Sequence, residues 1–412
     1  MNQSSIKLMI VAGEASGDKH GASLAIALRQ QYPDVEFEMF GAGGDEMRAA
    51  GVETLVDARE VAIIGIPEIA RALGKLYRAY KKLLDAARNR RPSAIVLIDW
   101  PDFNMRLARR LHNEGFKIVY YISPQVWAWR RYRVRALSRD VDRMLVILPF
   151  EEEFYKNAGI EVEYVGHPLA EAVRATVSRE EFVAKYSLDF ARPIIALLPG
   201  SRHKEIHYHL PAMLDGARRL QIEKTAVTRK TAKSQISNLK SQINNRQSET
   251  YNPQFVLPLA NTISRAQVEA IINEAGVEIQ IAERDTYNAL IHAEFAIVAS
   301  GTATVEAALA DTPMVIIYRG SELNWRLIRP LIKLDTFGMV NLIAGRRIVP
   351  ELMQHDATGE RIAREVHALL SDQVRLDEMR QGLQEVRERL RAGKGSGAQT
   401  AARAVMRTVL EN

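Results

Sequence analysis

The chain has 412 residues, more than a single hydrophobic core usually holds, so two domains of similar size are expected. It has no cysteine, which excludes disulfides, thiolate metal sites and a cysteine nucleophile, and no apolar run is long enough for a signal peptide or a membrane span. The net charge of +6 favours anionic partners such as phosphates, nucleic acid or acidic lipid headgroups, and a cytoplasmic enzyme fits these totals best.

Short apolar runs alternate with amphipathic segments along the chain. The runs are "IKLMIVAG", "EFEMFGAGG", "SAIVLID", "FKIVYYIS" and "RMLVILPF", and after Pro193 "IIALLPGS", "QFVLPLA", "VEIQIA", "FAIVAS" and "PMVIIYR". This pattern predicts two Rossmann-like, doubly wound α/β domains, each with a parallel sheet covered by helices. We place them at residues 1–170 and 171–357, and we expect residues 358–412 to form a charged helical segment that packs back on the first domain.

Residues 223–249 do not fit this alternation. Their sequence, "EKTAVTRKTAKSQISNLKSQINNRQSE", is polar, repetitive and almost free of large apolar side chains. It predicts a disordered insertion in the second domain, and a functional basic arm is the alternative.

In an open parallel sheet, ligands bind beyond the carboxyl ends of the strands, so polar residues that follow each apolar run are the candidates for a site. The first run is followed by "GEASGD", in which small residues permit a tight turn and Asp18 can cap a helix. The spacing of Gly13 and Gly17 does not match a dinucleotide fingerprint, and "FGAGGDEM" has Glu46 where the third glycine belongs. We interpret both segments as tight turns that line a cleft.

The third run ends in "DWPDF", with Asp99 at the end of the strand and Asp102 just after a proline. A carboxylate held there can accept a proton from a substrate hydroxyl, which makes Asp99 the candidate base. For Asp102 a helix cap is the favoured interpretation. The "DVD" at residues 140–142 is flanked by Arg139 and Arg143, so we expect a salt-bridged turn there instead of a metal site.

In the second half, "LLPGSRHKEI" places Arg202 after a strand and a tight turn, where a guanidinium can meet a diphosphate. His203 and His207 lie one helical turn apart without a third ligand nearby, so we interpret them as surface residues.

The most informative segment is "FAIVASGTATVEAALA", a buried strand, a turn and the start of a helix that carries Glu306 in its second turn. A helix N-terminus binds phosphate, and a carboxylate one turn further can bind both ribose hydroxyls. A plain helix cap explains the segment equally well. The turn consists of Ser300, Gly301 and Thr302.

The aromatic and basic segment "SPQVWAWRRYRVR", residues 123–135, could stack on a nucleic acid, lie on a membrane or surround a phosphorylated small molecule. An amphipathic helix is predicted at residues 63–82, and its apolar side carries Ile66, Ile69, Leu73 and Leu76. A helix that faces the core and exposes its charged side is the alternative.

Several of these motifs occur together and in one order: "GEASGD", "IDWPDF", "SPQVWAWR", "LPFE", "VGHPL", "LLPGSR", "ASGTATVEAAL", "NLIAG" and "PELMQ". In this the chain closely resembles the lipid-A-disaccharide synthases, which are glycosyltransferases with two Rossmann-like domains that face a cleft, the GT-B fold. Val340 departs from the family pattern, where many relatives have proline, and the insertion has no family counterpart.

The resemblance implies transfer of 2,3-diacylglucosamine from UDP to the 6-hydroxyl of 2,3-diacylglucosamine 1-phosphate (lipid X), with inversion and without a metal or cofactor. Asp99 matches the family's base. The implied donor site consists of Arg202, Ser300, Gly301, Thr302, Glu306, Asn341 and Gln354. The implied acceptor side or cleft consists of Glu14, Ser16, Asp18, Arg130 and His167.

Because diacylated substrates must leave and re-enter a bilayer, the resemblance also implies a peripheral enzyme on the inner face of the inner membrane. We then expect the helix at residues 63–82 to dip into anionic lipid, with Trp127 and Trp129 as anchors and the arginines of residues 130–135 on phosphates. A homodimer formed through the C-terminal segment is a further hypothesis.

Two alternatives come from other classes of protein. A UDP-sugar epimerase with the same architecture would share the Glu306 segment but would not need a surface for acyl chains. A nucleic-acid-binding protein would explain the segment at residues 123–135. It would not explain why Asp99, Arg202 and Glu306 all follow predicted strands, which would then be a coincidence.

Overall fold

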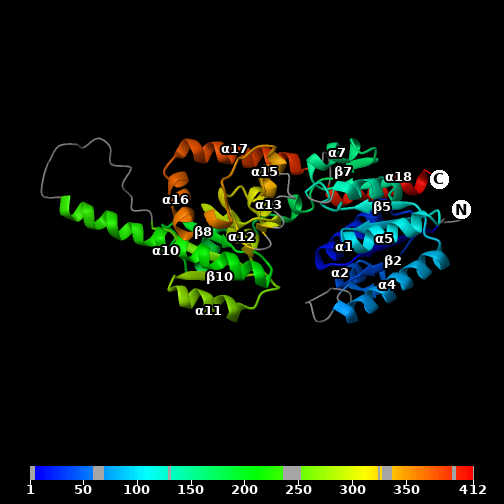
Figure 1. Ribbon diagram of the computed structural model, residues 1–412, viewed down its shortest axis with the longest axis horizontal. Coiled ribbons are helices and arrows are strands. Elements are labelled where there is room, and N and C mark those ends of the chain that lie inside the picture. The colour runs from blue at the N-terminus through cyan, green and yellow to red at the C-terminus, as the bar shows by residue number, and fades with distance from the viewer. Residues whose placement is uncertain are drawn as a thin grey trace. The chain divides into compact units, whose positions relative to one another are not determined.

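The computed structural model describes residues 5–58, 69–128, 131–234, 252–322, 325–326, 336–391 and 396–411. The chain forms two compact units (Figure 1). Unit 1 comprises Met1–Ala170 together with Arg389–Asn412, and unit 2 comprises Glu171–Glu388. The strands of each unit pair only in parallel within these ranges, which confirms the predicted class of two parallel α/β domains.

Unit 1 has a seven-stranded sheet with the order β3-β2-β1-β4-β5-β6-β7. The sheet grows in one direction from β1 to β3 and in the other from β4 to β7, so its topological switch point lies between β1 and β4. The strands are β1 (Ile6–Ala12), β2 (Phe37–Gly43), β3 (Glu53–Asp57), β4 (Ala94–Ile98), β5 (Ile118–Tyr121), β6 (Arg143–Val146) and β7 (Val162–Tyr164).

Alternate side chains of the unit 1 strands enter two separate cores. In β1, Leu8 and Ile10 pack with α1 and α18, whereas Met9 and Val11 pack on the opposite face of the sheet. Both cores are fully buried because helices cover both faces. The helices are α1 (Ala15–Gln31), α2 (Asp45–Ala49), α4 (Ile69–Arg90), α5 (Pro101–His112), α6 (Val134–Asp140), α7 (Pro149–Lys156) and α18 (Gly397–Leu410), and the short α8 (Leu169–Ala172) lies where unit 1 meets unit 2 in the chain.

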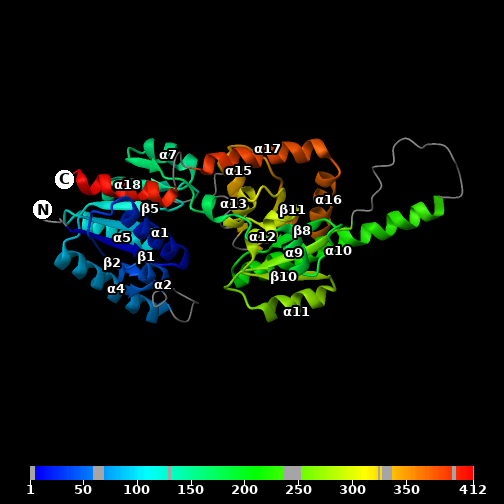
Figure 2. The same ribbon diagram turned by 180° about the vertical axis from the view of Figure 1, so that it is seen from behind.

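The C-terminal helix α18 belongs to unit 1, as its red ribbon among blue and cyan elements shows (Figures 1 and 2). Its small residues Ala401 and Ala404 are fully buried, which lets the helix lie close to α1. The segment expected at residues 358–412 therefore packs back on the first domain only in its last part, from Arg389 onward. The preceding helices α16 (Gly359–Leu370) and most of α17 (Gln373–Leu390) belong to unit 2.

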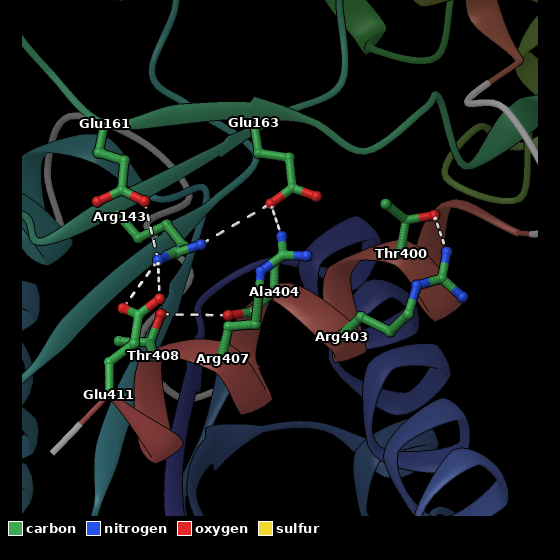
Figure 3. A network of polar contacts seen from close by, with 9 residues as sticks. All are labelled: Arg143, Glu161, Glu163, Thr400, Arg403, Ala404, Arg407, Thr408 and Glu411. Atoms are coloured by element: carbon green, nitrogen blue, oxygen red, sulfur yellow. Dashed lines mark hydrogen bonds and ion pairs between the residues drawn. The ribbon is translucent and has the colours of Figure 1, made fainter.

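A buried arginine ties the end of α18 to the sheet (Figure 3). Arg143 on β6 donates to both carboxylate oxygens of Glu411 at 2.9 Å and lies 2.8 Å from Glu161. Arg407 donates to Glu163 on β7. The salt-bridged turn predicted at "DVD" forms only in part. Arg139 pairs with Asp140, as expected, whereas Arg143 pairs with carboxylates of α18 and β7 instead.

Unit 2 has a six-stranded sheet with the order β10-β9-β8-β11-β12-β13, and its switch point lies between β8 and β11. The strands are β8 (Ile194–Leu198), β9 (Gln254–Leu259), β10 (Ile279–Glu283), β11 (Phe295–Ala299), β12 (Met314–Tyr318) and β13 (Glu351–Met353). The other described helices of unit 2 are α9 (Arg179–Lys185), α10 (His203–Ser234), α11 (Arg265–Ala275), α12 (Thr286–Ile291), α13 (Thr302–Leu309) and α15 (Met339–Ala344).

Helix α10 continues through residues 223–234, where the sequence predicts the start of the insertion, and residues 235–251 lie outside the described residues.

Candidate active site

Asp99 lies at the carboxyl end of β4, beside the switch point of the unit 1 sheet. Burial, and to a smaller extent the nearby carboxylate of Glu14, raise the pKa of Asp99 to about 6, although the backbone N–H of Trp100 donates to it and acts in the opposite direction. A carboxyl with this pKa is ionised at neutral pH and is a stronger base than an ordinary aspartate. The structure therefore places the candidate base where the sequence predicts it.

The backbone at Asp99 is held in an uncommon conformation. Asp99 and Trp100 have φ angles of 48° and 51°, in the left-handed region that non-glycine residues rarely adopt. The Asp99 carbonyl oxygen accepts hydrogen bonds from the Tyr120 hydroxyl and from Asn104 Nδ2, both at 2.8 Å. Neither residue was among the sequence candidates, because a tyrosine within a strand and an asparagine within a helix carry no motif.

The first glycine of the "GEASGD" turn, Gly13, is required for packing. A Cβ atom on Gly13 would lie 2.0 Å from the indole of Trp100, so the tryptophan side chain requires a glycine there. That indole stacks on Phe103, with ring centroids 3.9 Å apart. Glu14 and Ser16, at the start of α1, are exposed, and Glu14 is near enough to Asp99 to influence its pKa.

Asp18 does not line an open cleft. Its carboxylate accepts from the backbone N–H groups of Gly44, Glu46 and Met47 at 2.6, 3.0 and 3.1 Å, so it caps α2 from within α1. The sequence shows Asp18 as a cap but not the helix it caps, which lies 26 residues further along the chain.

Two histidines of unit 1 are held neutral. Burial, with a smaller contribution from the neighbouring His20 ring, lowers the pKa of His167 to about 4, and His167 Nδ1 accepts from the N–H of Leu169. Burial likewise lowers the pKa of His20 to about 4, and its ring meets Tyr121 edge-on at 6.5 Å. His167 was a candidate from its motif, whereas His20 inside a helix had no such signal.

Trp127 is not a surface anchor, contrary to the prediction. It is 6% exposed, and its indole N–H donates to the buried carboxylate of Glu151 at 3.0 Å. Trp129 and Arg130 lie outside the described residues. Further along the segment Arg133 donates to Asp102 at 2.6 Å, while Arg135 is exposed.

The helix expected at residues 63–82 corresponds to α4, which extends to Arg90. Leu76 packs against the core of unit 1, as the core-facing alternative predicts. Ile66 and the side chains of Ile69 and Leu73 lie outside the described residues. None of the helices within the described ranges has both the length and the apolar composition that crossing a bilayer would require.

In unit 2, Ser300, Gly301 and Thr302 follow β11 and begin α13. Gly301 has a φ of 150° and open space where a Cβ atom would project. One turn into the helix, Glu306 is half-buried, and burial raises its pKa. Among the described residues its carboxylate has no hydrogen-bond or ion-pair partner, so it is available to a ligand.

Arg202 follows β8, the strand next to β11, and its side chain is 80% exposed. Its only ion pair within the described parts of the chain is with Glu205, at 3.2 Å. The same carboxylate accepts from the N–H groups of Ser201 and Arg202, which fixes the turn after β8. The guanidinium is therefore carried by a rigid turn and remains open to solvent.

Asn341 does not face a ligand, contrary to the prediction. Its Nδ2 donates to the Val349 carbonyl and to Glu351 at 2.9 and 2.7 Å, and its Oδ1 accepts from Ile348 and Val349. All its hydrogen-bonding capacity holds the turn between α15 and β13. Asn341 therefore supports the fold of unit 2.

Gln354 has a similar supporting role but lines a cavity. Its side-chain amide exchanges two hydrogen bonds with the backbone of Gly320, at 2.8 and 3.0 Å, and its φ of 52° is left-handed. The cavity measures about 590 Å³ and lies between α10 and the loops after β12 and β13. Arg319, which follows β12 as Arg202 follows β8, also lines it and was not among the candidates. The same rule of polar residues at strand ends would have found Arg319.

No cluster of three metal-ligating side chains occurs in the described part of the chain. Two parallel-sheet units, one with a carboxyl of raised pKa and one with an exposed arginine and a helix N-terminus after neighbouring strands, are typical of GT-B enzymes that act on nucleotide sugars. A UDP-GlcNAc 2-epimerase from Neisseria meningitidis bound to UDP-GlcNAc has a TM-score of 0.59 at 11% identity, covering 99% of this chain and 100% of that one. A glycosyltransferase from Rickettsia africae has a TM-score of 0.52 at 11% identity, covering all of both chains. These likenesses show the fold.

The family model of lipid-A-disaccharide synthetase matches residues 8–232 and 224–405. A lipid-A-disaccharide synthase from Koribacter versatilis is 43% identical over 97% of this chain and 98% of its own, and one from Geobacter sulfurreducens is 41% identical over 94% of each. The chain belongs to the lipid-A-disaccharide synthetase family and is a glycosyltransferase that forms the lipid A disaccharide. The epimerases share only its fold, so the epimerase alternative is set aside.

Proposed function

We propose that the chain transfers 2,3-diacylglucosamine from UDP to the 6-hydroxyl of 2,3-diacylglucosamine 1-phosphate. The products are the β-1,6-linked disaccharide 1-phosphate and UDP. The observation that carries this proposal is Asp99, a half-buried carboxyl at a strand end whose pKa is raised to about 6. A base of this kind is what attack by an alcohol on a sugar carbon needs.

The proposed step is a single displacement with inversion. The acceptor oxygen forms a bond to C1 of the donor sugar while the bond from C1 to the UDP oxygen breaks, and the acceptor proton passes to Asp99. Because an alcohol has a pKa far above 6, Asp99 does not deprotonate it in advance, and proton transfer accompanies bond formation.

Unit 2 is the proposed donor site. The carboxylate of Glu306, which has no partner among the described residues, binds the ribose hydroxyls. The N-terminus of α13 together with Arg202 meets the negative charge that grows on the departing diphosphate. The open space over Gly301 allows a phosphate to approach the backbone there.

Unit 1 is the proposed acceptor domain, and we propose that it works at the surface of an anionic membrane. The support comes from α4, whose exposed side chains include Lys75, Tyr77 and Arg78, with Tyr77 68% exposed. Basic and aromatic side chains on one helix suit the headgroup region of anionic lipid. Trp127 has no part in this surface, because it is buried.

One experiment tests the reaction. UDP release from UDP-2,3-diacylglucosamine is measured with and without the monosaccharide 1-phosphate acceptor. A transferase releases UDP only when the acceptor is present, whereas release without acceptor, or no release in either case, would contradict the proposal.

A further inference from the structure

Glu151 on α7 is a buried carboxylate that the proposed mechanism does not use. It is 1% exposed, and three donors converge on it. Ser123 Oγ and Trp127 Nε1 donate to Oε1 at 2.7 and 3.0 Å, and the backbone N–H of Leu148 donates to Oε2 at 3.1 Å. Burying a carboxylate costs free energy, so a carboxylate at this position suggests a role beyond packing.

Two of the three donors lie on the loop that follows β5. A second side chain of α7 holds the same loop, since the Tyr155 hydroxyl donates to the Pro124 carbonyl at 3.0 Å. The Trp127 ring also meets Phe150 edge-on, with centroids 4.9 Å apart. The loop of residues 123–127 is thus fastened to α7, with Glu151 as the group that joins its two ends.

The start of this loop is coupled to the candidate base. Strands β4 and β5 are neighbours, and the Asp99 N–H donates to the Tyr121 carbonyl at 3.2 Å. Ile122, between that contact and the loop, has a φ of 63°, and Asp99 itself has a φ of 48°. A β-branched residue in the left-handed region is strained, so its surroundings must hold it there.

We propose that Glu151 is a positioning residue for the transfer reaction. By binding Ser123 and Trp127 it fixes the loop after β5. The fixed loop in turn holds the paired ends of β4 and β5, which orient Asp99. Glu151 touches no substrate. The inference rests on the proposed role of Asp99 as the base.

The test is Glu151→Gln, which keeps the size of the side chain. An amide offers one acceptor and one donor group where three donors converge, so at least one of the three contacts is lost. We expect kcat to fall about tenfold through misplacement of the base, with UDP affinity and the melting temperature close to those of the parent. The tryptophan emission should shift, and in a Trp127→Phe background the same substitution should produce no shift.

Glu152→Gln is the matched control, since Glu152 is the next residue of α7 and its carboxylate pairs with Lys156 at 2.9 Å near the surface. It should leave kcat, UDP affinity and emission unchanged. Ser123→Ala tests the contact from the other side, and it should lower kcat no further when it is combined with Glu151→Gln.

A folded Glu151→Gln protein with the kcat of the parent would overturn the proposal, and so would equal losses of kcat and UDP affinity, which indicate general damage. Should Glu151→Gln fail to fold, Ser123→Ala and Trp127→Phe decide, and parent-like kcat in both would overturn it. Failure of the proposed function looks different, because the parent would then not require the acceptor for UDP release.

Discussion

The carboxyl edges of the two sheets carry polar groups of different kinds. In unit 1, burial raises the pKa of Asp99 to about 6 and that of Glu151 to about 7, and lowers the pKa of His20 and His167 to about 4. In unit 2, Arg202 projects into solvent, and Glu306 is half-buried like Asp99, with a pKa that burial also raises and with no partner among the described residues.

The difference matches two tasks. A proton acceptor needs a carboxyl whose ionised form has lost part of its solvation, because that raises its basicity. An anion site needs charges that stay fixed and remain accessible to the ligand. Unit 1 thus has the properties of an acid–base site, and the exposed Arg202 and the N-terminus of α13 give unit 2 those of a binding site.

The largest expected effect comes from Asp99→Asn. It removes the base but keeps the size of the side chain, so turnover should fall by about 10²-fold or more while UDP affinity stays within about twofold. In the parent, kcat/KM for the acceptor should rise as the pH increases through about 6, because Asp99 must lose its proton to act. Steady-state kinetics against pH measure both effects, and near-normal turnover in the variant would remove Asp99 from the mechanism.

The same substitution should make the protein more stable at pH 8. The folded-state pKa of about 6 exceeds the usual value of 3.8, so folding disfavours the ionised carboxylate, and its penalty grows as the pH rises from about 4 to 6. Asp99→Asn removes at most about 3 kcal/mol of this penalty. Urea unfolding at several pH values should show a stability gain at pH 8 that shrinks toward pH 4. A variant less stable than the parent at pH 8 would mean that Asp99 is not under electrostatic strain.

The central strands and one edge strand, β10, were predictable, and the other three edge strands were not. Every apolar run identified in the sequence contains a strand, because β8 and β11, for example, are buried on both faces and consist of apolar residues throughout. The strands without such a run are β3, β7 and β13, and each lies at an edge of its sheet. These three strands are partly exposed, and β7 and β13 have only three residues each, so their sequences resemble those of loops.

The placement of the candidate site residues was predictable where they follow strand ends. That rule found Asp99, Arg202 and the start of α13. It did not separate groups that face a ligand from groups that the fold itself uses, because the partners of Asp18 and Gln354 lie 26 to 34 residues away in the chain. A sequence shows the capacity of a side chain for hydrogen bonding but not the backbone groups that occupy it.

Asn341→Ala tests that distinction in unit 2. The variant removes four hydrogen bonds from a buried turn and leaves the N–H groups of Ile348 and Val349 without their acceptor, which should cost about 2 kcal/mol of stability. UDP affinity of the folded variant should change little, as calorimetry below its melting temperature would show. A large loss of affinity in a protein of parent-like stability would return Asn341 to the donor site.

The smallest expected effects are those of the donor site itself. Arg202→Ala and Glu306→Ala should each weaken UDP binding about tenfold, because each removes one ligand contact without disturbing the fold. Exposed arginines are common on protein surfaces. A control is therefore needed to show that removal of any exposed arginine of unit 2 does not weaken UDP binding. Arg265→Ala serves, since Arg265 is also an exposed arginine of unit 2 and pairs with Glu269 and Glu283, and it should bind UDP as the parent does.

Salt should separate the two donor contacts. The Arg202 guanidinium is open to solvent, so its attraction for a diphosphate is screened, and the affinity gap between parent and Arg202→Ala should narrow as NaCl rises from low concentration to 0.5 M. The Glu306 carboxylate acts on uncharged ribose hydroxyls from a half-buried position, so the gap between parent and Glu306→Ala should persist at high salt. Equal salt dependence of the two gaps would mean that Glu306 does not bind the ribose.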